Sequence, residues 1–179
     1  AGFANITITP DSLIHSLLTK NAFLNLVNPF QPFIIGQRNI APRIALEQNI
    51  KFIMYGENQA EAHNHLKEND SSLMDFNHFT SNDQQNIFLG GKHILKWEEE
   101  GIPLKKLSYY LPLNKNTWQE FNGEVHYMSY FINWSPNNNY YYAKEHCNFE
   151  QNPNGRSEGT YTRYSSLDDK LDGQHYFTM

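Results

Sequence analysis

The feature that most constrains the fold is an apolar stretch at residues 50–55 that is followed at once by glycine and polar side chains. Its apolar side chains are nearly continuous, which is typical of a strand covered by helices on both faces. Gly56 comes next, and then the run Glu57-Asn58-Gln59-Ala60-Glu61. Open α/β folds bind ligands at the carboxyl ends of their strands. The segment therefore predicts a buried strand of an α/β protein with polar groups at its ligand-binding edge.

The residues after this strand have the chemistry of a binding site. Gly56 would let the backbone approach a ligand closely. Glu57 and Glu61 could orient a metal ion, a ribose or an amine, whereas Asn58 and Gln59 could bind a polar ligand through paired donors and acceptors. An ordinary strand-to-helix connection with solvated acids explains the same residues, and spacing alone does not decide between the two interpretations.

Local patterns place further elements on both sides of this strand. Polar and apolar side chains alternate over residues 5–8, which predicts a short strand. Thr9-Pro10-Asp11 then offers a cap residue, a first-turn proline and an acid, which predict the start of a helix. Asn28-Pro29 ends that helix, and residues 31–36 are predicted to be extended. The other predicted elements are a helix over 41–48 capped by Asn49, a partly helical insertion over 58–86, helices over 92–100 and from 103 to 110, a strand over 123–132, and a helix from Ser135-Pro136 to about His146. This alternation favours an α/β sandwich.

A second polar segment lies near the end of the chain, at residues 154–173. Arg156 could bind a phosphate or carboxylate through two hydrogen bonds, and Lys170 could supply a point charge. Asp168 and Asp169 could hold a divalent ion. A solvated acidic loop with salt bridges is the competing interpretation, and the residues alone favour it.

Two other patterns are better explained without a ligand. Gly90-Gly91 precedes a predicted helix and could form a phosphate cradle, but the GxxxxGK[ST] spacing is absent, so a turn is favoured. His63, His65 and His78 could be metal ligands, yet no pair of thiols accompanies them, and a solvated polar loop is favoured there as well.

Composition excludes several classes of protein. The 179 residues include 14 Lys plus Arg against 19 Asp plus Glu, a net charge of −5, which disfavours a surface built to bind nucleic acid. No apolar run reaches the roughly 18 residues that a membrane span requires. A single cysteine, Cys147, excludes an internal disulfide and fits a reducing compartment, so we expect a cytoplasmic protein. The abrupt ends lead us to expect a piece of a longer chain.

Several segments, taken in order, resemble the N-acetyl sugar amidotransferase family. The similarity extends over essentially the whole chain. That family serves bacterial surface glycans, including the pseudaminic and legionaminic acids of glycosylated flagellin and the sugars of lipopolysaccharide O-antigen. The segments that carry the resemblance are Gln31-Pro32-Phe33-Ile34-Ile35-Gly36-Gln37-Arg38-Asn39, Tyr55-Gly56-Glu57-Asn58-Gln59-Ala60-Glu61, Ile87-Phe88-Leu89-Gly90-Gly91, Glu124-Val125-His126-Tyr127, Arg156-Ser157-Glu158-Gly159-Thr160-Tyr161 and Ser166-Leu167-Asp168-Asp169-Lys170.

The resemblance implies an ATP-dependent enzyme of the PP-loop ATP pyrophosphatase superfamily, which has the adenine-nucleotide-hydrolase-like three-layer α/β sandwich. The chain would be the C-terminal part of that single domain, with a family-specific insertion at about residues 58–122. ATP would adenylate the amide oxygen of a sugar N-acetyl group, and ammonia would then displace AMP to give an acetamidino group. Mg²⁺ would bridge the phosphate oxygens. A glutaminase partner would supply the ammonia.

The resemblance also implies roles for individual residues. The implied catalytic residues are Glu57, Asn58 and Lys170. The implied cofactor-binding residues are Gly56, Arg156 and Thr160. The implied substrate-binding residues are Gln37, Arg38, Glu61 and Glu158. The implied metal ligands are Asp168 and Asp169.

The sequence departs from the family pattern because it contains neither the Ser-Gly-Gly-x-Asp-Ser pyrophosphate loop nor the Cys-x-x-Cys pair. We therefore expect a fragment that lacks half of the ATP site and hydrolyses no ATP alone. One alternative is a module that binds the sugar or the glutaminase without chemistry of its own, which the tyrosines at 140–142 would suit by stacking. Another is a PP-loop relative that modifies tRNA, although the negative charge counts against it.

Overall fold

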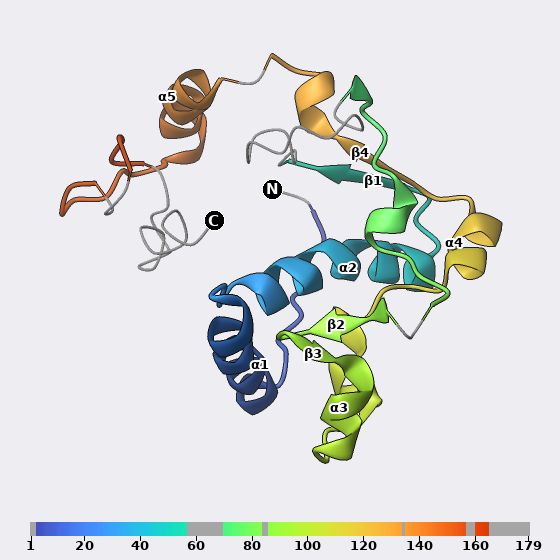
Figure 1. Ribbon diagram of the computed structural model, residues 1–179. Coiled ribbons are helices and arrows are strands. Elements are labelled where there is room, and N and C mark those ends of the chain that lie inside the picture. The colour runs from blue at the N-terminus through green and yellow to red at the C-terminus, as the bar shows by residue number, and fades with distance from the viewer. Residues whose placement is uncertain (1–2, 57–69, 84–85, 134, 157–159, 165–179) are drawn as a thin grey trace. The chain divides into compact units, whose positions relative to one another are not determined.

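The computed structural model describes residues 3–56, 70–83, 86–133, 135–156 and 160–164 (Figure 1). The chain divides into two compact units. The first contains residues 1–55 and 73–126, and the second contains residues 56–72 and 127–179.

The structure is a mixed α/β arrangement with small sheets. The α-helices are α1 (Ser12–Leu26), α2 (Gln31–Gln48), α3 (Ile94–Glu99), α4 (Lys115–Phe121) and α5 (Pro136–Cys147), and the 3₁₀ helices are η3 (Phe76–His78), η5 (Leu104–Tyr110) and η6 (Met128–Tyr130). Strands β1 (Phe52–Tyr55) and β4 (Glu124–Tyr127) form a two-stranded parallel sheet. Strands β2 (Phe88–Leu89) and β3 (Lys92–His93) form an antiparallel hairpin. None of the described helices combines the length and the apolarity that crossing a membrane requires.

The core of the first unit forms where α1, the hairpin, α3 and η5 meet. Trp97 of α3 is fully buried there, and its indole Nε1 donates a hydrogen bond to the carbonyl oxygen of Leu89 at 2.9 Å. Burying a large apolar side chain contributes about 1.5–3 kcal/mol, so this cluster contributes substantially to the stability of the unit. Its buried members are Ile14, Leu18, Leu89, Ile94, Trp97, Leu107 and Tyr110.

The N-terminal prediction is correct for the helix and wrong for the strand. Asp11 is the N-cap of α1, because its Oδ1 accepts hydrogen bonds from the backbone N–H of Leu13 and Ile14. The backbone N–H of Ile14, more than any other group, holds the pKa of Asp11 below its usual value. Residues 5–8 form no strand, and Ile6 is 60% exposed. In the described part of the chain, no strand pairs with this segment.

Residues 31–36 were predicted to be extended, and the structure shows that this is wrong, since α2 covers Gln31–Gln48 without a break. Pro32 lies in the first turn, where a backbone N–H would have no helical partner in any case, so the proline does not interrupt the helix. The predicted end is confirmed, because Asn49 caps α2 in the left-handed conformation. Pro42, which was expected in a first turn, lies inside the helix.

The prediction of a buried strand over 50–55 is confirmed for the strand and wrong for its burial. β1 covers Phe52–Tyr55, but Phe52 is 53% exposed and the next three residues are only half-buried. Among the described residues β1 has a neighbouring strand on one side only, which leaves much of its surface open.

Two other predicted elements are shorter in the structure. The strand predicted over 123–132 ends at Tyr127, where η6 begins. The helix predicted over 92–100 begins at Ile94, because the hairpin turn draws Lys92 and His93 into β3. By contrast, the helix from Ser135-Pro136 is confirmed, with Ser135 as N-cap of α5.

Candidate functional site

Strand β1 ends at Tyr55, whose hydroxyl contacts helix α2. Tyr55 Oη donates toward the carbonyl oxygens of Arg38 at 3.2 Å and Gln37 at 3.3 Å. In an α-helix the carbonyl of residue 38 accepts from the N–H of residue 42, but that residue is Pro42, which has no N–H. Tyr55 therefore supplies a hydrogen bond that Pro42 removes, and it fixes the carboxyl end of β1 against the middle of α2.

The backbone carbonyls of Gln37 and Arg38, two residues predicted to bind substrate, lie at this junction. Gln37 is exposed and Arg38 is half-buried. Neither side chain takes part in a hydrogen bond or ion pair with any residue that the structure describes. A carboxamide and a guanidinium can bind a carboxylate, a phosphate or an amide.

Strand β4 joins the same region through β1. The backbone N–H of Glu124 donates to the carbonyl oxygen of Lys51 at 2.8 Å. The rings of Phe52 and His126 stack with centroids 5.2 Å apart, and His126 Nε2 lies 3.1 Å from Glu124 Oε2. These contacts place a half-buried imidazole and an exposed carboxylate next to β1.

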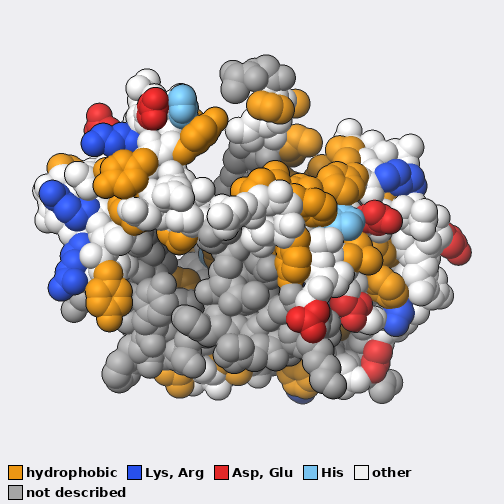
Figure 2. All heavy atoms as spheres, turned by 90° about the horizontal axis from the view of Figure 1, so that it is seen from above, with side chains coloured by type: hydrophobic (Ala, Val, Ile, Leu, Met, Phe, Trp, Pro, Cys, Tyr) orange, Lys and Arg blue, Asp and Glu red, His pale blue; other side chains and the backbone are white. Residues whose placement is uncertain are grey.

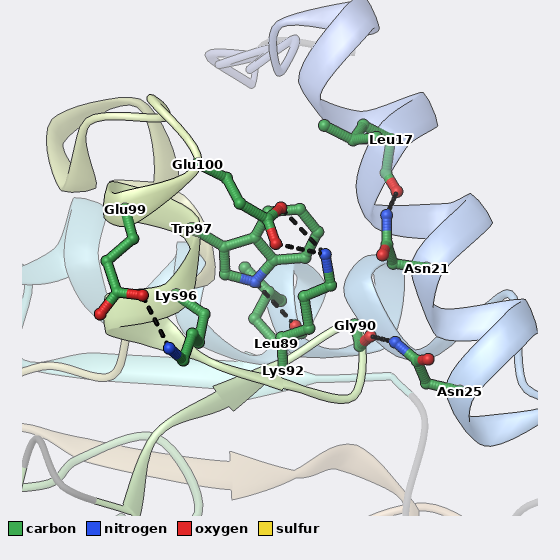
Figure 3. Close-up of polar contacts among 10 residues, drawn as sticks. All are labelled: Leu17, Asn21, Asn25, Leu89, Gly90, Lys92, Lys96, Trp97, Glu99 and Glu100. Atoms are coloured by element: carbon green, nitrogen blue, oxygen red, sulfur yellow. Dashed lines mark hydrogen bonds and ion pairs between the residues drawn. The ribbon is translucent and has the colours of Figure 1, made fainter.

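The β2–β3 hairpin packs against α1 and the start of α2 (Figure 3). Gly90 and Gly91 form its turn with φ of 62° and 73°, so the predicted turn is confirmed. The Gly90 N–H donates to Gln31 Oε1 at 3.0 Å, and Asn25 Nδ2 donates to the Gly90 carbonyl at 2.9 Å. A Cβ on Gly91 would lie 2.4 Å from the Asn25 Cβ, so the turn has room for glycine only. The Gly90 amide is thus used in packing the turn against α2, which argues against a phosphate cradle.

A surface ion pair covers the hairpin from the side of α3. Lys92 Nζ lies 2.8 and 2.9 Å from the two carboxylate oxygens of Glu100 and 4.7 Å from the centroid of the Trp97 ring (Figure 3). Exposed pairs of this kind contribute about 1 kcal/mol or less. Lys92 is therefore a packing residue of the hairpin and not a free cation.

Residues from four of the segments that carry the family resemblance are thus joined within the first unit, and Tyr55 is the residue of segment 55–61 that belongs to this unit. Segment 31–39 contacts Tyr55 through the carbonyls of Gln37 and Arg38, and it contacts Gly90 through Gln31. Segment 124–127 pairs with β1. Sequence reasoning missed Tyr55 and Gln31 as contact residues. The signal for Tyr55 was Pro42, because a proline inside a helix leaves a carbonyl that requires another donor.

Gly56, Arg156 and Thr160 are the predicted site residues that the second unit contains within its described part. Gly56 is exposed, and a Cβ there would meet no atom within 4 Å. Arg156 is exposed and forms no hydrogen bond or ion pair with a described residue, so its guanidinium is available to an anion. Thr160 is 7% exposed, and its Oγ1 donates to the carbonyl oxygen of Thr162 at 3.1 Å. The Thr160 hydroxyl is therefore engaged within the local backbone.

The remaining predicted residues lie outside the described residues. They are Glu57, Asn58, Glu61, Glu158, Asp168, Asp169 and Lys170, together with His63 and His65. Within the described ranges no group of three His, Cys, Asp or Glu side chains could hold a metal ion.

The sequence matches no protein-family model and no curated protein. On the face drawn in Figure 2, hydrophobic side chains cover much of the described surface among uncharged side chains and backbone, and the charged side chains lie in smaller patches.

Proposed function

We propose that the chain is part of an ATP-dependent amidotransferase that converts a sugar N-acetyl group into an acetamidino group during bacterial surface-glycan biosynthesis. The observation that carries the proposal is the junction at α2, where segments of the resemblance that are far apart in sequence are held together by specific hydrogen bonds. Residues that share one site must come together in the fold, whereas chance similarities need not. The three-layer PP-loop sandwich is the fold that we propose for the complete domain.

The residues available for binding fit the charges of ATP and of the sugar. Arg156, which has no anionic partner among the described residues, would bind a phosphate. Gly56 would border the nucleotide with Thr160, while Gln37 and Arg38 would contact the sugar. Glu61 and Glu158 would also contact the sugar, and Asp168 and Asp169 would hold Mg²⁺.

The reaction requires activation of a poor electrophile. The amide oxygen attacks the α-phosphorus of ATP and pyrophosphate leaves. Ammonia then adds to the imidate carbon, and AMP leaves with the former amide oxygen. Glu57, Asn58 and Lys170 would align the amide and stabilise the charge that develops on the phosphate oxygens.

The first test uses pyrophosphate release. We expect the 179-residue chain alone to release none from ATP, whereas a longer protein that contains the pyrophosphate loop releases it when N-acetyl sugar and ammonium are present. In that longer protein, Glu57→Ala and Lys170→Ala should each lower the rate, while Glu47→Ala and Lys144→Ala, at exposed helical positions, should not. Sugar-dependent release by the chain alone would contradict the proposed division of the ATP site, and unchanged rates in the first two variants would remove those residues from it.

A second candidate function is sugar binding without chemistry. Tyr141 and Tyr142 of α5 are 59% and 65% exposed, and rings at such exposure can stack on a sugar face. Titration of the chain with N-acetylglucosamine and separately with ATP distinguishes the two functions. Saturable binding of the sugar that is lost in Tyr141→Ser and Tyr142→Ser, with no amidine formed by the longer protein, would favour the binding module.

A further inference from the structure

The first unit contains a pocket of about 220 Å³ beside its core, and no role above uses it. Ile87, Ile94, Leu104 and Leu111 are four of its eight lining residues. Ile94 belongs to the buried core, and the other three pack against that core. An apolar cavity of about 150 Å³ is large enough for benzene, so this pocket has room for a substituted ring.

The polar part of the pocket consists of side chains without charge. Ser81, Asn82 and Asn114 line it, and no Lys, Arg, Asp or Glu is among the described residues of its wall. Asn114 Oδ1 caps α4 by accepting from the Thr117 N–H at 3.0 Å and from Thr117 Oγ1 at 3.3 Å. Its Nδ2 group takes part in no hydrogen bond with a described residue. The pocket therefore offers an apolar wall and an amide donor.

We propose that this pocket binds a small neutral molecule with an apolar ring and a carbonyl oxygen. The ring packs between Ile94, Leu104 and Leu111, and the carbonyl oxygen accepts from Asn114 Nδ2. A charged ligand is disfavoured because it would lose its hydration beside apolar walls without gaining a counterion. This proposal is independent of the amidotransferase function.

The test is an NMR titration of the full chain with acetanilide, which has a phenyl ring and an amide carbonyl. We expect saturable shifts of the backbone amides of Ile87, Ile94 and Leu104, with a dissociation constant in the millimolar range for so small a ligand. Toluene, which lacks the carbonyl, should bind several-fold more weakly, and benzoate, which is charged, should cause no saturable shift. Absence of saturation by acetanilide, or equal binding of benzoate, would overturn the proposal.

Two pairs of variants locate the binding. Leu104→Trp fills the pocket and should abolish the shifts, whereas Leu95→Trp adds the same ring at a position that is 44% exposed on α3 and should not. Asn114→Asp keeps an N-cap acceptor but removes the donor, and we expect binding about fivefold weaker or more. Asn137→Asp makes the same charge change at an exposed position of α5 and should leave binding unchanged. Equal binding by both members of either pair would show that the ligand lies elsewhere.

Discussion

Tyr55 donates a hydrogen bond to the Arg38 carbonyl, which Pro42 leaves without its helical donor. The coupling energy between Tyr55 and Pro42 tests this explanation. Tyr55→Phe removes only the hydroxyl and leaves a partly buried carbonyl without its donor. A neutral hydrogen bond contributes about 0.5–1.5 kcal/mol net, so we expect a loss of about 1 kcal/mol in the free energy of unfolding. Pro42→Ala restores the backbone N–H that normally donates to the carbonyl of residue 38 in an α-helix.

The double-mutant cycle isolates this term. In the Pro42→Ala background, Tyr55→Phe should cost close to nothing, which gives a coupling energy of about 1 kcal/mol. Pro42 is fully buried, so Pro42→Ala also loses packing energy. The single variant Pro42→Ala and the double variant share this loss, so it cancels in the coupling energy. The assay is urea unfolding followed by the fluorescence of the buried Trp97 and Trp118.

Tyr109→Phe is the matched control, because Tyr109 is half-buried in the same unit and its hydroxyl bonds to no described residue. It should change stability by less than about 0.5 kcal/mol. An equal cost of Tyr55→Phe in the wild-type and Pro42→Ala backgrounds would refute the reasoning, because the hydroxyl would then not be replacing the missing helical donor.

Further predictions concern three glycines and an aspartate. Gly91→Ala should lower the free energy of unfolding in urea by about 2–3 kcal/mol, because the new Cβ is strained at a positive φ and also clashes with Asn25. Gly101→Ala, at φ 87° with no atom within 4 Å of the new Cβ, should lower it by only about 1 kcal/mol. Equal losses in the two variants would contradict this. Gly56→Ala should leave stability within about 0.5 kcal/mol but lower the turnover of the longer protein, and unchanged turnover would remove Gly56 from the nucleotide site. The Asn77 N–H, more than any other group, holds the pKa of Asp75 below 3.8, so Asp75 contributes stability above that pH and loses it as the pH falls through its folded pKa. Asp75→Asn should therefore flatten the acid side of the stability profile in unfolding measured against pH, and an unchanged acid slope would contradict it.

Local signals in the sequence predict several parts of the fold well. Ser135 with Pro136 begins α5, Asn49 ends α2, and Gly90-Gly91 forms a turn. Each of these depends on hydrogen bonding or backbone angles within a few residues, and such effects are readable from the sequence.

The wrong predictions of secondary structure and burial concern residues whose conformation depends on contacts with residues far away in the sequence. The pattern around Pro32 predicted extended backbone, but Pro32 occupies the first turn of α2, where a backbone N–H would have no helical partner. Pro42 was predicted to lie in the first turn of a helix over 41–48, but it lies inside α2, where Tyr55 supplies the hydrogen bond that it removes. The apolar run ending at Tyr55 predicted full burial, whereas burial depends on how many strands and helices cover it, which the run itself does not encode. For the candidate site, the family resemblance implied Gln37 and Arg38 but not the Tyr55 hydroxyl that bonds to their backbone carbonyls.

The most direct measurement of the central claim is mass spectrometry of the sugar product. The longer protein that contains the pyrophosphate loop is incubated with ATP, Mg²⁺, ¹⁵N-labelled ammonium and N-acetylglucosamine, free or linked to a nucleotide. The proposed function predicts a product in which the acetamido oxygen is replaced by a ¹⁵N-labelled NH group, with AMP and pyrophosphate formed in equal amounts. ATP consumption without ¹⁵N in any sugar, or unlabelled sugar as the only species recovered, would contradict it.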